Sequence, residues 1–160
     1  MSEADPSGSA ARGQRSGPRT TRSWRAPAPA GRSASIAAPL GMLGLLAVQF
    51  LMGMALNLYV TIPPLGAGMA AMMRTGPLVM VHMMLGMVLA GGALLALAMA
   101  LPWGRRAVGC AAAALAGILV AGLGGLLFLM DGQGNGASYL MAVGFLVAVA
   151  GYVAEIVAVR

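Results

Sequence analysis

The second apolar segment of the chain reads GPLVMVHMMLGMVLAGGALLALAMAL from Gly76 to Leu101 and carries no charged residue. A helix needs about 20 apolar residues to cross the roughly 30 Å hydrocarbon core of a bilayer. The segment is long enough to cross, and it holds the only histidine of the chain, His82. It therefore predicts a membrane-spanning helix with one ionisable side chain inside it.

Three other stretches of the chain are uncharged in the same way, at residues 33–73, 107–130 and 132–154. Only 9% of the 160 residues are charged, whereas a soluble domain carries about a quarter. We predict an all-α protein whose residues 36–160 form a four-helix transmembrane bundle. The expected spans are about 39–62, 77–101, 107–130 and 137–159.

The first 35 residues differ from the rest of the chain. They are rich in Ser, Ala, Gly, Pro and Arg and have almost no bulky apolar side chains. Such a composition cannot bury enough surface to offset the entropy lost on ordering. We therefore predict a disordered basic tail over 1–35. The apolar run that follows is too long for a signal peptide and lacks a cleavage site, so the first span is expected to be an uncleaved signal-anchor.

The arginines predict the orientation. In the predicted topology nine of the ten basic residues, all arginines, lie on one side and Arg74 lies alone on the other. Because cytoplasmic flanks are enriched in arginine, we predict a multi-pass protein of the inner (cell) membrane with cytoplasmic N- and C-termini. Loops 63–76 and 131–136 would lie outside. Trp103 and Tyr152 are expected at the inner interface, where amphipathic rings gather.

This placement also explains the sequence pI of about 11.1 without nucleic acid. The basic residues lie in the tail and at helix ends, where topology requires them, and the expected environment is the lipid bilayer. The six arginines of the tail would also attract anionic lipid.

Each predicted span carries a stripe of small residues, which in lipid marks where helices touch. Polar residues lie on the same stripes and are expected to face the bundle interior. From their depths we predict a hydrogen bond between Asn57 and His82, with Gln49 near the midplane. Glu155 is expected to reach the interface or an arginine. Helix faces made of small residues also predict association with a second copy of the chain, as a homo-oligomer, or with a partner membrane protein. The stripes comprise Gln49, Gly53 and Asn57; His82, Gly86, Ala90, Ala93 and Ala100; Ala113, Gly117, Ala121 and Gly124; Gly144, Ala148, Gly151 and Glu155.

His82 is the first candidate for chemistry. Imidazole is a common ligand of haem and metals. Haem would need a second axial ligand, and since there is no second histidine, that ligand would be a methionine from another helix or a group from a second subunit. The simpler interpretation is a neutral histidine whose hydrogen bond fixes the register of two helices.

Methionines form the second candidate. Met80, Met83, Met84 and Met87 are spaced i, i+3, i+4 and i+7, so they share one helix face. Thioethers suit Cu(I), and the stripe is a candidate copper site. His82 lies roughly 160° around the helix from Met80, so a mixed site within this helix is not expected. The simpler interpretation is flexible apolar packing against lipid or a neighbouring helix.

Glu155 is the third candidate. A membrane-embedded glutamate can couple proton movement to transport, as in small four-span multidrug transporters. In those proteins the glutamate lies in the first span, where this chain has Gln49. Glu155 lies close to the end of the last span, so we favour a structural role. A small proton-coupled transporter stays an alternative.

The run QFLMGMALNLYVTIP from Gln49 to Pro63, with His82 and Leu85-Gly86 downstream, resembles a group of small uncharacterised four-span membrane proteins of actinobacteria. The resemblance covers about 39–100, and it implies an inner-membrane protein without assigned catalytic residues. The chain has no nucleophile–base pair, P-loop, carboxylate pair or zinc signature. We therefore expect no enzyme but a structural or accessory membrane subunit. A haem- or copper-handling protein is the alternative, beside the transporter.

Overall fold

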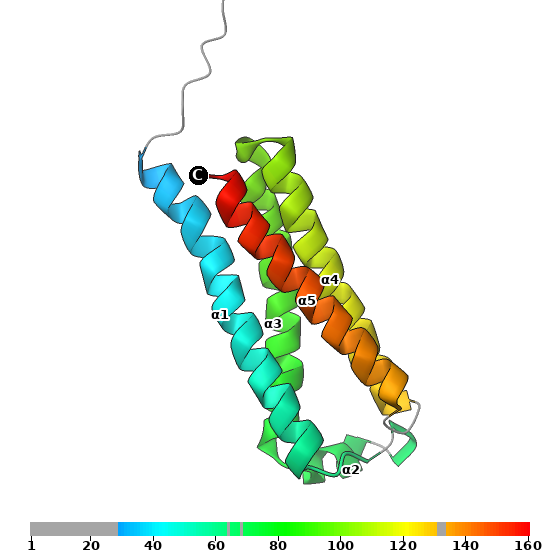
Figure 1. Cartoon of the computed structure of the whole chain (residues 1–160). Helices are drawn as coiled ribbons and strands as arrows, with labels where there is room; N and C mark the ends of the chain where they lie inside the picture. The colour runs from blue at the N-terminus through cyan, green and yellow to red at the C-terminus, as the bar shows by residue number, and fades with distance from the viewer. Residues whose placement is uncertain (1–28, 64, 68, 131–133) are drawn as a thin grey trace, which may run out of the picture.

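Four long helices make up the protein in the computed structural model (Figure 1), which describes residues 29–63, 65–67, 69–130 and 134–160. They are α1 (Pro29–Tyr59), α3 (Pro77–Ala100), α4 (Arg105–Met130) and α5 (Asn135–Ala158). The short elements are η1 (Leu65–Ala67), α2 (Met69–Arg74) and η2 (Leu101–Trp103). The predicted all-α four-helix fold is confirmed.

All four long helices are long and apolar enough to cross a membrane. The candidate spans are Ser35–Tyr59, Pro77–Trp103, Arg105–Met130 and Asn135–Ala158, each within a few residues of its prediction. The predicted start and end of the first span are less accurate, because α1 itself begins at Pro29 and ends at Tyr59. Residues 29–35 of the predicted disordered tail are thus helical, and residues 1–28 lie outside the described residues.

Glycines with positive φ set the entry into two of the helices. Gly76 (φ 105°) precedes Pro77 at the start of α3, and Gly104 (φ 95°) precedes α4. Residues with a side chain rarely adopt these angles. Proline suits the first helical turn because its missing N–H has no helical acceptor there. The α3–α4 connection is short, since only η2 and Gly104 separate the two helices, whereas the chain from α1 to α3 passes through η1 and α2.

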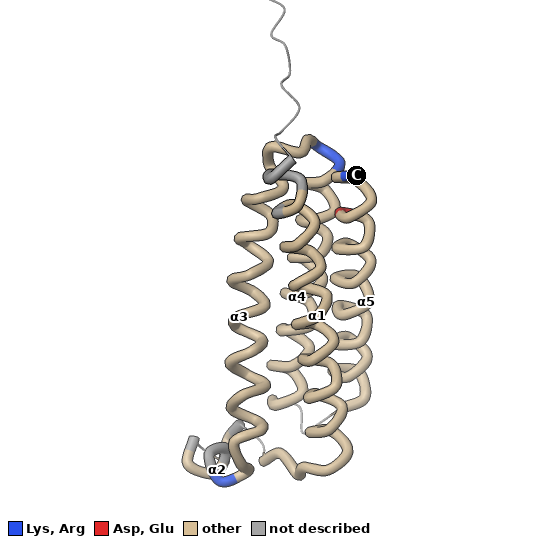
Figure 2. The backbone as a smooth tube through the Cα atoms, turned by 90° about the vertical axis from the view of Figure 1, so that its left-hand side faces the viewer, with Lys and Arg blue, Asp and Glu red and all other residues tan. Residues whose placement is uncertain are grey.

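The helices surround the core in the order α1, α3, α4, α5, so that α1 and α4 lie diagonally across the bundle, with no Cα atoms within 8 Å of each other in the described residues. Figure 2 shows the basic start of α4 and the C-terminus at one end, and α2 with its arginine at the other. The described arginines therefore gather at one end of the bundle, apart from Arg74 of α2.

The closest contact in the bundle is between α4 and α5. A Cβ atom on Gly117 would lie 2.5 Å from the backbone N of Ala148, and one on Gly151 would lie 2.7 Å from the backbone N of Ala114. Since these neighbours are backbone atoms, only glycine fits. The small-residue stripes predicted for these two helices are confirmed at the buried positions Gly117, Gly124, Gly144, Ala148 and Gly151. Ala113 is instead exposed.

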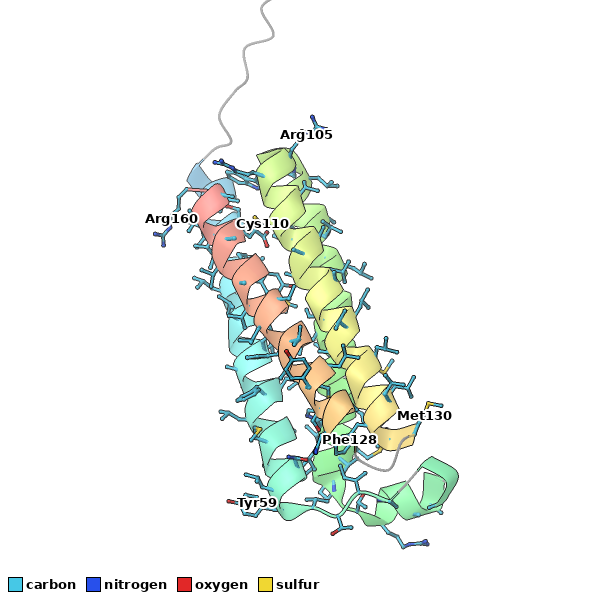
Figure 3. The ribbon with its side chains drawn as sticks, turned by 45° about the vertical axis from the view of Figure 1, so that its right-hand side comes forward. Tyr59, Arg105, Cys110, Phe128, Met130 and Arg160 are labelled. Carbon is cyan, nitrogen blue, oxygen red and sulfur yellow. The ribbon has the colours of Figure 1, made fainter. Side chains whose placement is uncertain are left out.

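Side chains from all four long helices form a core. This core lies toward the end of the bundle that holds the C-terminus, away from α2. Tyr152 is its largest fully buried side chain and packs with Leu46, Leu89 and Ile118. Phe50 of α1 stacks on Phe145 of α5 with ring centroids 4.8 Å apart. Beyond these contacts α1 and α5 diverge toward the α2 end (Figure 1 and Figure 3).

Candidate functional site

The structure joins two of the predicted polar residues across the α1–α3 contact. The Gln49 Nε2 atom lies 3.3 Å from His82 Nε2 and donates to the main-chain oxygen of His82 at 3.2 Å. Because an amide NH₂ group only donates, the contact with His82 Nε2 is a hydrogen bond in the neutral tautomer that carries its proton on Nδ1. A single glutamine therefore binds both the ring and the backbone of His82.

Two glycines make room for this Gln49–His82 pair. A Cβ atom on Gly53 would lie 3.1 Å from His82 Cε1, and one on Gly86 would lie 3.4 Å from Gln49 Nε2. Each glycine follows a polar residue by four positions on the same helix. Because α1 and α3 run antiparallel, the histidine ring rests on the glycine of α1 and the glutamine amide on the glycine of α3.

The predicted hydrogen bond between Asn57 and His82 is wrong. Asn57 is exposed, and His82 lies level with Gly53, one helical turn deeper. The prediction assumed that the first span continued to residue 62, whereas α1 ends at Tyr59. Asn57 is thus two residues from the helix end, where α1 and α5 have already diverged.

Two atoms of the Gln49–His82 pair have no partner. His82 Nδ1 and Gln49 Oε1 are both buried and make no hydrogen bond. Leaving a buried polar group unsatisfied costs about 1–3 kcal/mol. The pair can therefore donate one further hydrogen bond and accept one, which suits a water molecule or another small polar group.

The methionine stripe points away from this pair. Met80, Met83, Met84 and Met87 are 37%, 45%, 59% and 72% exposed on the outside of the bundle. His82 faces α1 instead, so the structure does not bring the histidine and the methionines together. Within the described residues no three His, Cys, Asp or Glu side chains gather in a group suited to a metal ion.

Glu155 lies inside the bundle. It is only 3% exposed, and its Oε2 atom has no hydrogen-bond partner. The side chain is enclosed because its position on α5 shares the inward face of Gly144, Ala148 and Gly151, and its Oε2 makes no hydrogen bond with an arginine in the described residues. This face is the one that packs on α4.

Sequence reasoning missed Tyr152, which it placed at the inner interface. The side chain is 0% exposed and its hydroxyl has no hydrogen-bond partner. Tyr152 precedes Glu155 by three residues, so the two share one helix face. The signal in the sequence was this spacing, together with the small residues Ala148 and Gly151 before it.

Comparison with known proteins adds no family to this picture. No protein-family model, curated protein or solved structure matches the chain. Its function is therefore inferred from the bundle and its polar residues.

Proposed function

We propose that this chain is a non-enzymatic integral protein of the inner membrane that acts as a small accessory subunit. It would associate with a second copy or with a partner membrane protein through the outer face of α1. Four helices suited to cross a membrane support the membrane location. The gathering of described arginines at one end supports cytoplasmic termini.

The observation that carries the proposal is a small-residue face that the bundle itself does not use. Ala37, Gly41, Gly44 and Val48 follow one another at i, i+4, i+7 and i+11 along α1, and all four are exposed. A Cβ atom on Gly41 or Gly44 would meet nothing within 4 Å. In lipid, small residues on a helix surface allow the backbone of another helix to approach closely. The face therefore suits a helix outside this chain.

The contacts of the Gln49–His82 pair support a structural role for these two side chains. The Gln49–His82 pair joins α1 to α3 through two hydrogen-bonding contacts and places each side chain on a glycine of the other helix. This arrangement fixes the register of the two helices. It holds α1 in the orientation that turns Gly41 and Gly44 outward.

Replacing Gly41 and Gly44 together by leucine should break the association. We expect the wild-type protein, purified in mild detergent, to elute with a protein mass above its own 16.0 kDa, as measured by light scattering with the detergent subtracted. The double variant should elute as a monomer, because two leucine side chains keep a second helix from close approach. A loss of about 1.4 kcal/mol weakens association tenfold, enough to change the elution at micromolar concentration.

Gly91→Leu is the matched control. Gly91 is also exposed, and a Cβ atom there meets nothing within 4 Å, but it belongs to α3. This variant should keep the wild-type mass. A wild-type protein that is monomeric and free of any copurifying protein would contradict the proposed role.

A further inference from the structure

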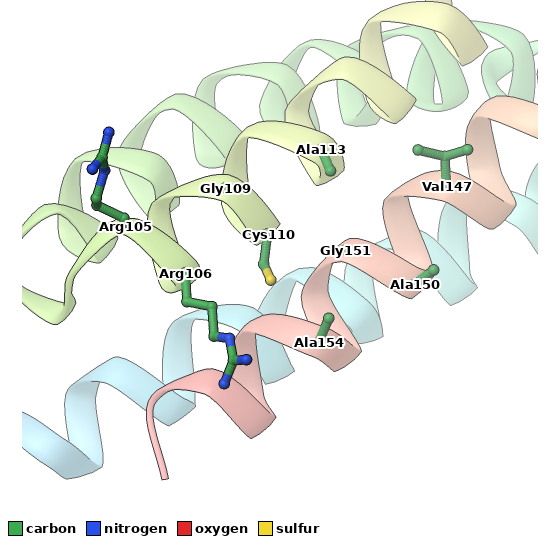
Figure 4. Close-up of a pocket in the computed structure, with 9 residues that line it drawn as sticks. All are labelled: Arg105, Arg106, Gly109, Cys110, Ala113, Val147, Ala150, Gly151 and Ala154. Carbon is green, nitrogen blue, oxygen red and sulfur yellow. The ribbon is translucent and has the colours of Figure 1, made fainter.

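A shallow groove of about 550 Å³ runs along the outer surface between α4 and α5 (Figure 4). Its apolar lining consists mainly of small residues from both helices, among them Gly109, Ala113, Ala150 and Ala154. Two arginines, Arg105 and Arg106, line one end. The groove is thus apolar along its length and positively charged at one end.

The close packing of the two helices explains why this groove is shallow. Near Gly151 the backbones of α4 and α5 are in contact, since a Cβ atom on that glycine would lie 2.7 Å from the backbone N of Ala114. The residues on either side of the contact are mostly small, so Arg106 at one end is the only long side chain that extends across the described groove. Farther along the same helices the exposed positions hold Leu119, Leu123 and Leu146. A flexible hydrocarbon chain can lie in such a groove and gain contacts on both walls.

The charged end of the groove lies where a lipid headgroup would be. Arg105 is the first residue of α4, which is long enough to cross the hydrocarbon core. Figure 4 shows the guanidinium of Arg106 extending across the groove toward α5, whereas Arg105 points along the outside of α4. Both arginines are exposed. The free N–H groups of the first turn add to the positive potential at this end.

Nothing acidic on the described surface neutralises these charges. Glu155 is the one acidic residue among the described residues, and it is 3% exposed inside the bundle. The two guanidinium groups are therefore available to an anion from outside the protein. An anionic phospholipid carries both a phosphate group, which matches the charge of the arginines, and acyl chains, which match the apolar groove.

We propose that this groove binds one anionic phospholipid, with its phosphate at Arg106 and an acyl chain between α4 and α5, while Arg105 adds to the positive charge at the same end. Basic sites between helices on the cytoplasmic side commonly take acidic headgroups. The site lies on α4 and α5, away from the α1 face proposed for association. It rests on the proposed membrane location and orientation but not on the proposed association, so a monomeric protein would bind the lipid equally well.

The test is native mass spectrometry of the full-length protein, titrated in detergent with phosphatidylglycerol or phosphatidylcholine of the same chain length. The wild-type protein should bind one phosphatidylglycerol about tenfold more tightly than phosphatidylcholine. Arg105→Gln combined with Arg106→Gln should abolish this preference, because the charge at the end of the groove is lost. Gly109→Leu should weaken both lipids, since it fills a channel in which a Cβ meets nothing within 4 Å.

Arg160→Gln is the matched control, because it removes an exposed arginine that does not line the groove. It should leave the tenfold preference unchanged. Equal binding of the two lipids by the wild-type protein would overturn the proposal, as would a double arginine variant that retains the preference. If Gly109→Leu instead dissociated a dimer and left lipid binding unchanged, the groove would be a protein interface.

Discussion

Replacing Gly117 by alanine should destabilise the protein by about 3 kcal/mol, the upper part of the usual range for overpacking. The added Cβ atom would lie 2.5 Å from the backbone N of Ala148 and 2.6 Å from the carbonyl oxygen of Gly144. Neither neighbour can rotate away, so α4 and α5 must separate. Unfolding by sodium dodecyl sulfate in mixed micelles, followed by circular dichroism, measures the change.

Gly122→Ala tests whether this loss comes from packing. Gly122 lies on the same helix, but a Cβ atom there meets nothing within 4 Å. Alanine forms helix better than glycine by about 1 kcal/mol, so this variant should be as stable as the wild-type protein or more so. Equal destabilisation by the two alanines would mean that α4 and α5 do not touch at Gly117.

Replacing His82 by an apolar residue should lower the free energy of unfolding by about 1–3 kcal/mol, because the amide of Gln49 then stays buried without the imidazole as its partner. We expect a similar loss from Gln49→Leu, and a smaller loss in the double variant than the sum of the two. The coupling free energy should fall between about 0.6 and 1.7 kcal/mol, the average and the maximum for side-chain hydrogen bonds between membrane helices. The same unfolding measurement on the four proteins gives this value.

Asn57→Leu is the control for the Gln49–His82 pair. Asn57 is exposed near the end of α1, so the variant should unfold like the wild-type protein. A large effect at Asn57 together with no coupling between Gln49 and His82 would show that the wrong residue had been paired with the histidine.

The spans were predictable because the bilayer fixes their length. Uncharged stretches of about 20 residues or more separated by proline, glycine or arginine leave few ways to arrange the chain. Pro77 begins the predicted second span and is also the first residue of α3 in the structure. The contact between Gly117 and Ala148 follows from the small-residue spacing of α4 and α5, since small residues mark where helices approach in lipid.

The polar contacts were less predictable, because periodicity gives the face of a residue but not its partner. Asn57 and Gln49 lie on the same side of α1, and the choice between them depended on where the helix ends. Glu155 and Tyr152 were assigned to the interface from their distance to the chain end. Their burial instead follows from the close approach of α5 to its neighbours, which a single helix pattern does not contain.

Fusions of a reporter at residues 70, 104 and 133 give the most direct test of a four-span membrane protein with both termini in the cytoplasm. A reporter that is active only outside the cytoplasm should give signal at residues 70 and 133 and none at residue 104. A reporter that works only in the cytoplasm should show the reverse pattern. A cytoplasmic signal at residue 70, or the same signal at residues 70 and 104, would contradict this topology.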